Sequence, residues 1–274
     1  MNSQADFSCT LCKGRIKVPV ITIGPHAVSR CDSCGLGFLD SHVHETGEDT
    51  VYDEGFYTSQ NMIKVPSEGI RECLPKVRFV RKYRPTGRLL DVGCGLGYFL
   101  AAAQQEGFTV CGMEESGWAT EYIRKEFGFP VWPAPLETSA LEGGSLDVCT
   151  MWQVIEHVPD PLAALRKIQD LLKAGGVLIM ETRNHRGFDA KMLLERWGGW
   201  ALPYHLWHFD PASLRLLSET AGFRVLRLKV HKSDYVKKNL RKIPILGVLR
   251  NPVASLFAGS NITVVAEKAK QGGG

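Results

Sequence analysis

The sequence predicts an α/β protein whose main domain is a doubly wound, mostly parallel sheet with helices on both faces, preceded by a small cysteine-rich module. Three observations predict this class. From residue 86 onward, apolar runs of strand length alternate with helical segments. Glycines at alternate positions follow the first run, and two CxxC pairs stand near the N-terminus. With 274 residues, of which 44% are hydrophobic, the chain can bury one full core and carry an appendage.

The chain divides into three predicted regions. Residues 1–45 hold the two CxxC pairs around a short β-rich stretch, VPVITI, and are expected to fold around a metal ion. Residues 46–85 are expected to form a connecting segment, and its second half, GIRECLPKVRFVRKYRP, predicts one amphipathic helix. Residues 86–274 are the predicted main domain.

The main domain is predicted to alternate strands and helices. Short apolar runs typical of strands covered on both faces are RLLDV, FTVCGM, LDVCTMW and GVLIMET. The helical segments between them are YFLAAAQQEG, GWATEYIRKEFG and PLAALRKIQDLLKAGG. Such alternation implies right-handed crossovers and a parallel sheet. Asp210 with Pro211 and then Gly222 mark the start and end of a further helix, which precedes the strands FRVLRLKV and SNITVVAEK.

The glycine-rich turn DVGCGLG raises the question of its ligand. A dinucleotide-binding turn needs G-x-G-x-x-G, but counting from Gly93 and Gly95 places Tyr98 at the third site. Glycines at alternate positions still let a ligand lie against the backbone. Asp91 suits a ligand with positive charge rather than a pyrophosphate, and Glu114, at the end of the second strand, can accept hydrogen bonds from two ribose hydroxyls. The pattern predicts a positively charged nucleoside without phosphate.

S-adenosylmethionine (SAM) is such a ligand, and four motifs in order resemble those of class I SAM-dependent methyltransferases. These are DVGCGLG, CGMEES, MWQVIEHVPDP and LLKAGGVLIMET. The segment HLWHFDPASLRLLSETAGF resembles the closing region of a subgroup related to ubiquinone-biosynthesis O-methyltransferases. The resemblance covers about residues 84–230 and the last strand. It implies a Rossmann-like sheet with an antiparallel last strand, SAM as methyl donor and S-adenosylhomocysteine (SAH) as product.

The resemblance also implies roles for individual residues. Those expected to line the methionine and ribose of SAM are Gly93, Cys94, Gly95 and Gly97, with Asp91 beside them, Glu114 on the ribose diol and Gln153 at the methionine end. Leu136 and Glu137 are expected to meet the adenine, although the acidic residue of this motif is less clearly marked in VWPAPLETSALEG.

The four N-terminal cysteines have the spacing of a structural zinc site. Cys9, Cys12, Cys31 and Cys34 form two CxxC pairs separated by eighteen residues. Four thiolates would leave no open position on the metal, so we expect a zinc ribbon without chemistry at the metal; four unrelated reduced cysteines are the alternative. Residues 1–50 carry four Lys and Arg against six Asp and Glu, which disfavours phosphate contact. The ribbon is expected to shape a small-substrate pocket or a protein contact.

Three histidines are candidates for a base that deprotonates the methyl acceptor. His157 follows the fourth strand in IEHVPDP, and His205 and His208 lie in PYHLWHFD, within a predicted acceptor lid at about residues 184–212. We place His208 ahead of His157, because the lid segment should contact the acceptor and aromatic neighbours can exclude water. Hydrogen bonding at a helix entry, capping and packing are the alternative roles.

Residues 232–258 form an insertion between the last two strands. Residues 231–250 hold six Lys and Arg against one Asp, a net charge of +5, so the remainder of the chain carries −1. The local basicity beside an apolar run suits an anionic membrane surface or a negatively charged acceptor. A dimer contact or a solvated helix is the alternative that we favour, and the oligomeric state stays open.

The sequence therefore predicts a SAM-dependent methyltransferase that acts on an oxygen of a small-molecule, glycan or lipid-linked acceptor. An rRNA or tRNA base methyltransferase and a SAM-binding scaffold without turnover are the alternatives. No segment has the length and apolarity of a transmembrane helix or the pattern of a signal peptide. We expect a cytoplasmic protein, with peripheral membrane contact through residues 232–258 as the one exception considered.

Overall fold

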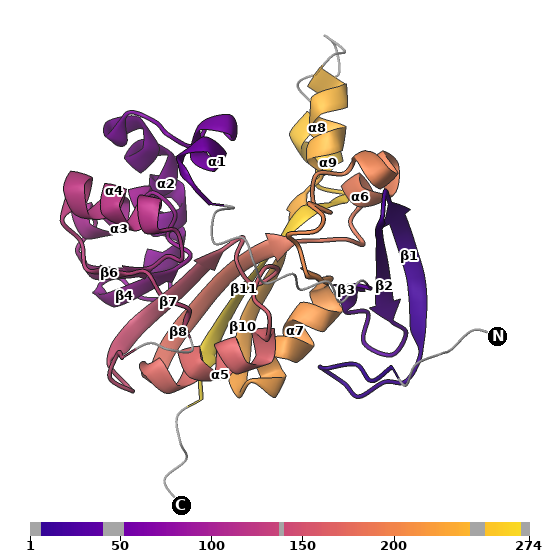
Figure 1. Cartoon of the computed structure of the whole chain (residues 1–274), viewed down its shortest axis with the longest axis horizontal. Coiled ribbons are helices and arrows are strands. Elements are labelled where there is room, and N and C mark those ends of the chain that lie inside the picture. The colour runs from indigo at the N-terminus through magenta and orange to yellow at the C-terminus, as the bar shows by residue number, and fades with distance from the viewer. Residues whose placement is uncertain (1–6, 41–51, 137–139, 242–249, 270–274) are drawn as a thin grey trace, which may run out of the picture.

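The computed structural model describes residues 7–40, 52–136, 140–241 and 250–269, and these form two sheets (Figure 1). The central sheet has seven strands in the order β10-β11-β8-β7-β4-β5-β6, and the small sheet has four in the order β1-β2-β3-β9. The central strands are β4 (Gly87–Val92), β5 (Phe108–Met113), β6 (Val131–Trp132), β7 (Leu146–Trp152), β8 (Leu172–Arg183), β10 (Phe223–Lys232) and β11 (Ala258–Lys268). The small sheet comprises β1 (Lys17–Ile23), β2 (His26–Cys31), β3 (Gly37–Leu39) and β9 (Trp207–His208).

The topology confirms the predicted fold class. Strands β4 to β8 pair in parallel, and β11 pairs antiparallel with both β8 and β10. The last strand of the chain is therefore the antiparallel strand of a Rossmann-like sheet, as expected. The carboxyl ends of the parallel strands lie at one edge of the sheet, where ligands bind in such folds.

Helices cover both faces of the central sheet (Figure 1). The described helices are α1 (Glu54–Ser59), α2 (Pro66–Arg81), α3 (Tyr98–Gln105), α4 (Gly117–Phe127), α5 (Pro161–Leu171), α6 (Phe188–Leu193), η2 (Leu194–Arg196), α7 (Pro211–Thr220), α8 (Asp234–Arg241) and α9 (Arg250–Ala254). Side chains cap the predicted starts: Asp160 accepts hydrogen bonds at the start of α5, and Asp210 forms a capping box with Ser213 in α7.

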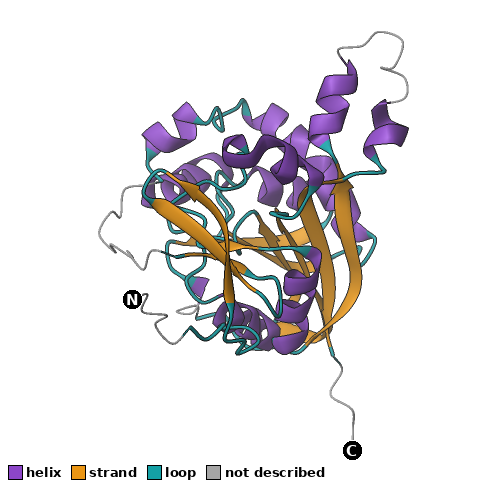
Figure 2. Cartoon of the chain, turned by 90° about the vertical axis from the view of Figure 1, so that its right-hand side faces the viewer, coloured by secondary structure: helices purple, strands orange, loops and turns teal. Residues whose placement is uncertain are grey.

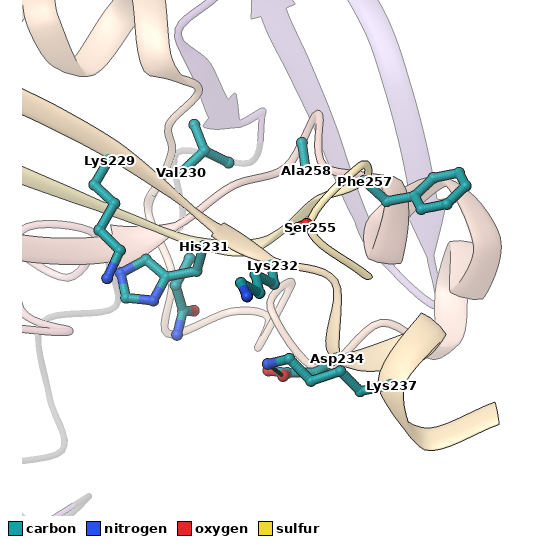
Figure 3. A pocket seen from close by; sticks show the side chains of 10 residues that line it. Lys229, Val230, His231, Lys232, Asp234, Lys237, Ser255, Phe257 and Ala258 are labelled. Carbon is teal, nitrogen blue, oxygen red and sulfur yellow. Dashed lines mark hydrogen bonds and ion pairs between the residues drawn. The ribbon is translucent and has the colours of Figure 1, made fainter. Parts of the chain in front are cut away.

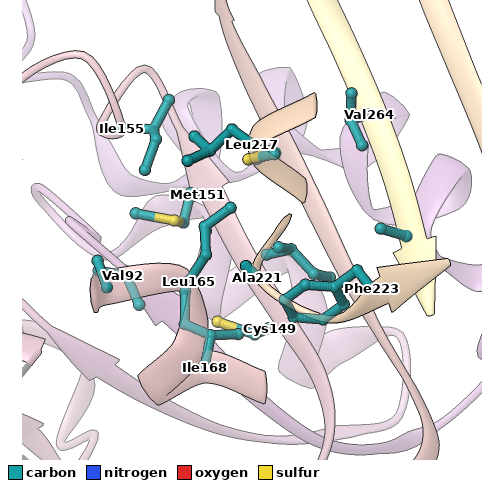
Figure 4. Close-up of a cluster of buried hydrophobic side chains, with 14 of the residues drawn as sticks. Val92, Cys149, Met151, Ile155, Leu165, Ile168, Leu217, Ala221, Phe223 and Val264 are labelled. Carbon is teal, nitrogen blue, oxygen red and sulfur yellow. The ribbon is translucent and has the colours of Figure 1, made fainter. Parts of the chain in front are cut away.

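Two apolar layers hold the helices to the sheet, because successive strand residues point to opposite faces. Leu89 of β4 and Val148 of β7 pack toward α2, α3 and α4, whereas their neighbours Leu90 and Cys149 pack toward α5 and α7. Figure 4 shows the second layer, in which side chains of α5 and α7 meet those of β7 and β11. The strands are thus buried on both faces, as their continuous apolar runs predicted.

The predicted boundary between the helix LRKIQDLLKAGG and the strand after it was wrong. Helix α5 ends at Leu171, and β8 begins directly at Leu172, which is fully buried and pairs with Leu146. The first glycine of the pair, Gly175, has a φ of 75° within β8, next to a register shift in the pairing with β7. These glycines therefore allow an irregularity in the strand instead of ending the helix.

The N-terminal module is joined to the predicted lid by β-pairing. Strand β9 adds to the edge of β3, with Gly37 opposite His208 and Phe38 opposite Trp207. In Figure 2 this small sheet faces the viewer in front of the central sheet. The module is therefore a wall of the main domain, fixed at the segment that leads into α7.

The basic insertion projects from the end of the central sheet as α8 and α9 (Figure 1). Residues 242–249, between these helices, lie outside the described residues. In the part of the chain that is described, no helix is long and apolar enough to cross a membrane. The described residues of the segment 232–258 give no support for peripheral membrane contact, which stays a prediction.

Candidate functional site

Unpartnered buried polar atoms mark one edge of the central sheet. Within the described residues, five buried side-chain nitrogen or oxygen atoms have no hydrogen-bond partner. Four of them belong to the end of β7, the loop after it and the adjoining strand β9: Trp152, Gln153, Glu156 and His208. Such groups are costly in a folded protein unless a ligand uses them. The edge of the sheet at the carboxyl end of β7 is therefore the candidate site.

The glycine turn after β4 leaves space for a ligand at this edge. Gly93, Gly95 and Gly97 have φ values of 65°, 53° and 76°, which favour glycine. A Cβ atom at Gly93 would lie 2.5 Å from Val154 and one at Gly97 would lie 2.9 Å from Ile123, so packing excludes side chains there. A Cβ atom at Gly95 would meet no described atom within 4 Å. Gly95 therefore borders open space, as a surface that receives a ligand requires.

Glu114 lies beside the same turn at the end of β5. Its carboxylate accepts hydrogen bonds from the backbone N–H groups of Gly95, at 2.8 Å, and Ser116, at 3.0 Å, and the Tyr57 hydroxyl lies 3.5 Å away. The side chain is only 8% exposed, and this burial raises its pKa despite the backbone hydrogen bonds. The sequence placed Glu114 at the turn, and the structure brings the two together.

Asp91 and Cys94 are buried on either side of the first glycine. The Asp91 carboxylate accepts a hydrogen bond from Thr150 at 2.6 Å, and burial raises its pKa to about 8. Burial also raises the pKa of the Cys94 thiol well above its ordinary value, so this thiol stays protonated. An unliganded carboxyl group with this pKa is suited to a cationic partner, which would favour its ionised form.

Gln153 is held in a strained position directly after β7. Its φ is 61°, its backbone N–H donates to the Glu181 carbonyl at 2.8 Å, and its Nε2 donates to the Glu181 carboxylate at 3.3 Å. The opposite amide atom, Oε1, is buried without a partner. Backbone strain and an orphaned acceptor at one residue are typical of a binding site, and the acceptor fits an ammonium group.

The remaining predicted adenine contacts are only partly described. Leu136 is 6% exposed and packs in the core layer that contains α5. Glu137 lies outside the described residues. Sequence reasoning missed Tyr57 of α1, which is buried, approaches Glu114 and stacks on Trp118 at 5.4 Å between ring centroids. The aromatic-rich stretch YDEGFYTSQ was the available signal for a helix that covers the site.

A second cluster lies at the start of the loop after β7. Glu156 is 1% exposed; its Oε2 accepts a hydrogen bond from Thr182 at 2.8 Å, and its Oε1 has no partner. One side-chain ligand atom from each of Glu156, His157 and His205 lies within 4.8 Å of the others, close enough to hold one cation. Burial raises the pKa of Glu156 to about 7.

The two imidazoles of this cluster have defined tautomers. His157 Nδ1 lies 3.0 Å from the Tyr204 carbonyl, and His205 Nδ1 lies 2.9 Å from the Gly199 carbonyl. A carbonyl only accepts, so each Nδ1 carries the proton and each Nε2 keeps a lone pair. Burial lowers the pKa of His157 and lowers that of His205 to about 4, so both rings are neutral at pH 7. Each Nε2 can accept a proton or bind a metal ion.

His208 lies farther along the same row of rings. The centroids of His157 and His205 are 4.6 Å apart, and those of His205 and His208 are 6.4 Å apart. His208 is 2% exposed, packs on Trp200 and has an unpartnered Nε2, and burial lowers its pKa well below the usual range. It lies on β9 opposite Gly37 of β3, where the lid meets the N-terminal module, and its ring contacts are with Trp200 and His205.

Tyr52 connects the two clusters. Its carbonyl accepts a hydrogen bond from the Ser116 hydroxyl beside Glu114, and its own hydroxyl lies 3.4 Å from His157 Nδ1. The segment leading into α1 thus runs from the glycine turn to the histidine cluster. No residue of this segment was predicted to be functional.

The four N-terminal cysteines come together as their spacing predicted. Their Sγ atoms all lie within 4.8 Å of one another, with Cys9 3.7 Å from Cys34 and Cys12 3.5 Å from Cys31. Zn–S bonds of about 2.3 Å in a tetrahedron place sulfur atoms about 3.8 Å apart. The arrangement fits a four-thiolate zinc ion.

Comparisons of the sequence point to one family. The profile of the family described as "Methyltransferase domain" matches residues 62–228. A ubiquinone biosynthesis O-methyltransferase of Escherichia coli O7:K1 is 32% identical over 114 residues, which cover 36% of this chain and 44% of that protein. The same enzyme from Escherichia coli O139:H28 has the same identity and coverage. The chain thus spans less than half the length of these curated relatives.

Comparisons of the structure agree on the fold. A SAM-dependent methyltransferase from Archaeoglobus fulgidus superposes with a TM-score of 0.59 at 18% identity, over 79% of this chain and all of that one. A SAM-dependent methyltransferase from Mesorhizobium loti has a TM-score of 0.53 at 19% identity, over 70% of this chain and 96% of that one.

Proposed function

Because the chain belongs to the SAM-dependent methyltransferase family, we propose that it transfers the methyl group of SAM to an oxygen of a small-molecule, glycan or lipid-linked acceptor. The observation that carries the proposal is the pair of unpartnered oxygens, Gln153 Oε1 and Glu156 Oε1, in the loop after β7. Gln153 follows β7 at the same edge of the sheet as the glycine turn, and Glu156 belongs to the cluster with His157 and His205, which can activate an acceptor hydroxyl.

The cofactor half of the site is built from the glycine turn and the ends of β4 and β5. We assign Glu114 to the ribose hydroxyls, since its carboxylate borders Gly95 and open space. Asp91 and Gln153 Oε1 face the methionine ammonium, because one is a carboxyl group and the other an acceptor without a partner. The turn residues Gly93, Cys94 and Gly97 shape the backbone along the ligand, and Leu136 with Glu137 are assigned to the adenine side.

The acceptor half of the site supplies a proton acceptor. When bound, SAM provides an electrophilic methyl group on a sulfonium, so the protein needs chiefly to align the acceptor oxygen and remove its proton. His157 Nε2 has the free lone pair for this task, because its Nδ1 proton is held by the Tyr204 carbonyl. His157 Nε2 would take the acceptor O–H proton as the methyl group is transferred, and release of that proton to solvent would restore the neutral imidazole.

We propose His157 and His205 for this role ahead of His208, which ranks first on the sequence alone. This preference is supported by the position of His157 in the loop after β7 next to Tyr52, whereas His208 is buried on β9 against Trp200. A divalent cation held by Glu156, His157 and His205 would serve the same end by lowering the pKa of the acceptor hydroxyl. Turnover that survives prolonged chelation supports the imidazole base, and loss restored by added Mg²⁺, which does not replace zinc among four thiolates, supports the cation.

The four-cysteine site is proposed to hold structural zinc. Four thiolates fill a tetrahedral site and leave no position for a substrate. Strand β3, which follows the second CxxC pair, carries β9 and so positions the lid. The zinc ribbon therefore acts on the acceptor pocket through the backbone and not through metal chemistry.

The experiment that tests this function uses SAM with a labelled methyl group and the purified chain. Label should be transferred to a small-molecule or lipid extract and released by hydriodic acid as methyl iodide, which identifies an O-methyl group. Label found in the RNA fraction would overturn the acceptor class in favour of a base methyltransferase. SAH binding without transfer to any fraction would support a SAM-binding scaffold.

A further inference from the structure

A basic pocket lies beside β10 and β11, at the β10 side of the central sheet. It has a volume of about 590 Å³, which is within the usual range for small-molecule sites. Its walls come from the end of β10, the start of β11, helix α8 and the turn that follows α9 (Figure 3). The lining residues are Lys229, Val230, His231, Lys232, Asp234, Lys237, Ser255, Phe257, Ala258 and Asn261.

The charge of this pocket is unbalanced. Asp234 is the one acidic lining residue, and it pairs with Lys237 at 2.6 Å. Lys229 and Lys232 are exposed and form no ion pair or side-chain hydrogen bond with any residue that the structure describes. In Figure 3, Lys229 and His231 lie on one side of the drawn group, the Asp234–Lys237 pair lies on the other, and Lys232 lies between them. Two unpaired ammonium groups in a concave site favour an anion.

Hydrogen bonds connect the pocket to the methyl-transfer site. His231 Nε2 lies 3.2 Å from the Glu181 carboxylate, whose other oxygen accepts from Gln153 at 3.3 Å. Asn261 of the pocket accepts a hydrogen bond at 3.0 Å from Arg183, at the end of β8. Because β10 runs parallel to β8, its end lies at the same edge of the sheet as Gln153. Along this path the Glu181 side chain alone lies between the pocket residue His231 and Gln153.

We propose that this pocket binds a phosphate ester group of the methyl acceptor, with Lys229 and Lys232 as its cationic contacts. The inference rests on the proposed function, because it assigns a phosphate group to the acceptor of the same site. The acceptor oxygen lies at His157, and the anionic group extends along the sheet edge past Glu181 and His231. Val230, Phe257 and Ala258 give the pocket an apolar wall for the organic part that joins the two ends.

The test is a calorimetric titration of the full chain with inorganic pyrophosphate, without SAM. The variant K229Q/K232Q should bind pyrophosphate at least about tenfold more weakly than the wild type, since charge-assisted contacts are the strong ones. The matched control K82Q/K125Q removes the same charge from exposed lysines of α4 and the end of α2, and it should bind as the wild type does. Equal affinity in the two double variants would overturn the proposal.

SAH titrations of the same proteins separate this inference from the proposed function. Unchanged SAH affinity in K229Q/K232Q shows that the variant is folded and that the pocket is distinct from the cofactor site. A wild type that fails to bind SAH contradicts the proposed function, whereas a wild type that binds SAH but not pyrophosphate contradicts only the phosphate pocket. Flotation with vesicles containing phosphatidic acid then distinguishes a lipid acceptor from a soluble one. Flotation of the wild type that is lost in K229Q/K232Q indicates a phosphate carried by a lipid, and absence of flotation in the wild type indicates a soluble phosphate ester.

Discussion

The two halves of the sheet edge are built in different ways. In the cofactor half, Gly95 and Glu114 form a direct hydrogen bond across only 19 positions of sequence. In the acceptor half, His157 contacts Tyr204 across 47 positions, and His185 of the lid contacts the Gly35 carbonyl of the N-terminal module across 150. The glycine turn and Glu114 of the cofactor half belong to one local unit of two strands and the helix between them, whereas the acceptor half is assembled from three distant segments.

The difference indicates which half of the site can change its shape. A local turn needs few residues to reproduce its geometry, so the cofactor half carries motifs that the sequence displays openly. The acceptor half depends on β-pairing between the ribbon and the lid, so its shape can change with either partner. We therefore expect perturbation of the ribbon or the lid to affect methyl transfer and to leave cofactor binding intact.

The largest expected effect comes from the zinc site. Cys31→Ser removes a fully buried ligand, and zinc binding in structural sites is worth on the order of 10 kcal/mol. We expect loss of the metal and proteolytic cleavage within residues 7–40, measured by metal analysis and limited proteolysis. Cys73→Ser, at a cysteine outside the cluster, is the control. Loss of SAH binding in Cys31→Ser would show that the two halves are not separable.

His157→Ala should lower turnover by roughly 10²-fold or more, the usual scale for losing a general base, with SAH affinity unchanged. Burial lowers the pKa of His157 below 6.5, so its Nε2 lone pair persists below that pH. In the plot of turnover rate against pH, protonation of His157 should therefore lower the wild-type rate only below pH 6.5. This decrease should be absent in the variant. His26→Ala is the control. A greater loss in His208→Ala would restore His208 as the base.

Glu114→Ala should weaken SAH binding by about 1–3 kcal/mol, because ribose hydroxyls and the Gly95 N–H lose their acceptor. Isothermal calorimetry measures the change, and Glu126→Ala, at an exposed glutamate of α4, is the control. An SAH affinity in Glu114→Ala equal to that of the control would remove Glu114 from the cofactor half.

The smallest expected effect is the release of part of one proton when SAH binds at pH 7. Burial raises the pKa of Asp91 to about 8, so the free carboxyl group is largely protonated at pH 7. A neighbouring ammonium group favours the carboxylate and lowers this pKa, which releases part of one proton. Binding enthalpies in two buffers of different ionisation enthalpy should therefore differ, and Asp91→Asn should abolish the difference. Identical enthalpies for the wild type would contradict the placement of Asp91.

The sequence was sufficient for the central sheet and for most of the cofactor half. Continuous apolar runs identify strands buried on both faces, and the turn from Gly93 to Gly97 requires glycine for local reasons. The start of β8 at Leu172 was missed, because a strand can follow a helix directly without the glycine that usually ends it. Local patterns place elements well, but they do not show where one element passes into the next.

The acceptor half was predicted only in fragments. His157 and His205 were singled out, but the proximity of their rings and the free Glu156 oxygen depend on the path of the lid. The pairing of β3 with β9 joins residues that lie far apart in the sequence. No periodic pattern in either segment predicts this pairing. Tyr52 was missed for the same reason, since its position over His157 is set by tertiary packing and not by its neighbours in sequence.

The most direct test of the division into two halves is a crystal structure of the chain with SAH. Our account predicts the ribose on Glu114, the amino group at Gln153 Oε1, and the sulfur atom on the side of Gln153 that faces His157. A sulfur atom that points away from the cluster of Glu156, His157 and His205, or SAH bound outside the turn from Gly93 to Gly97, would contradict it.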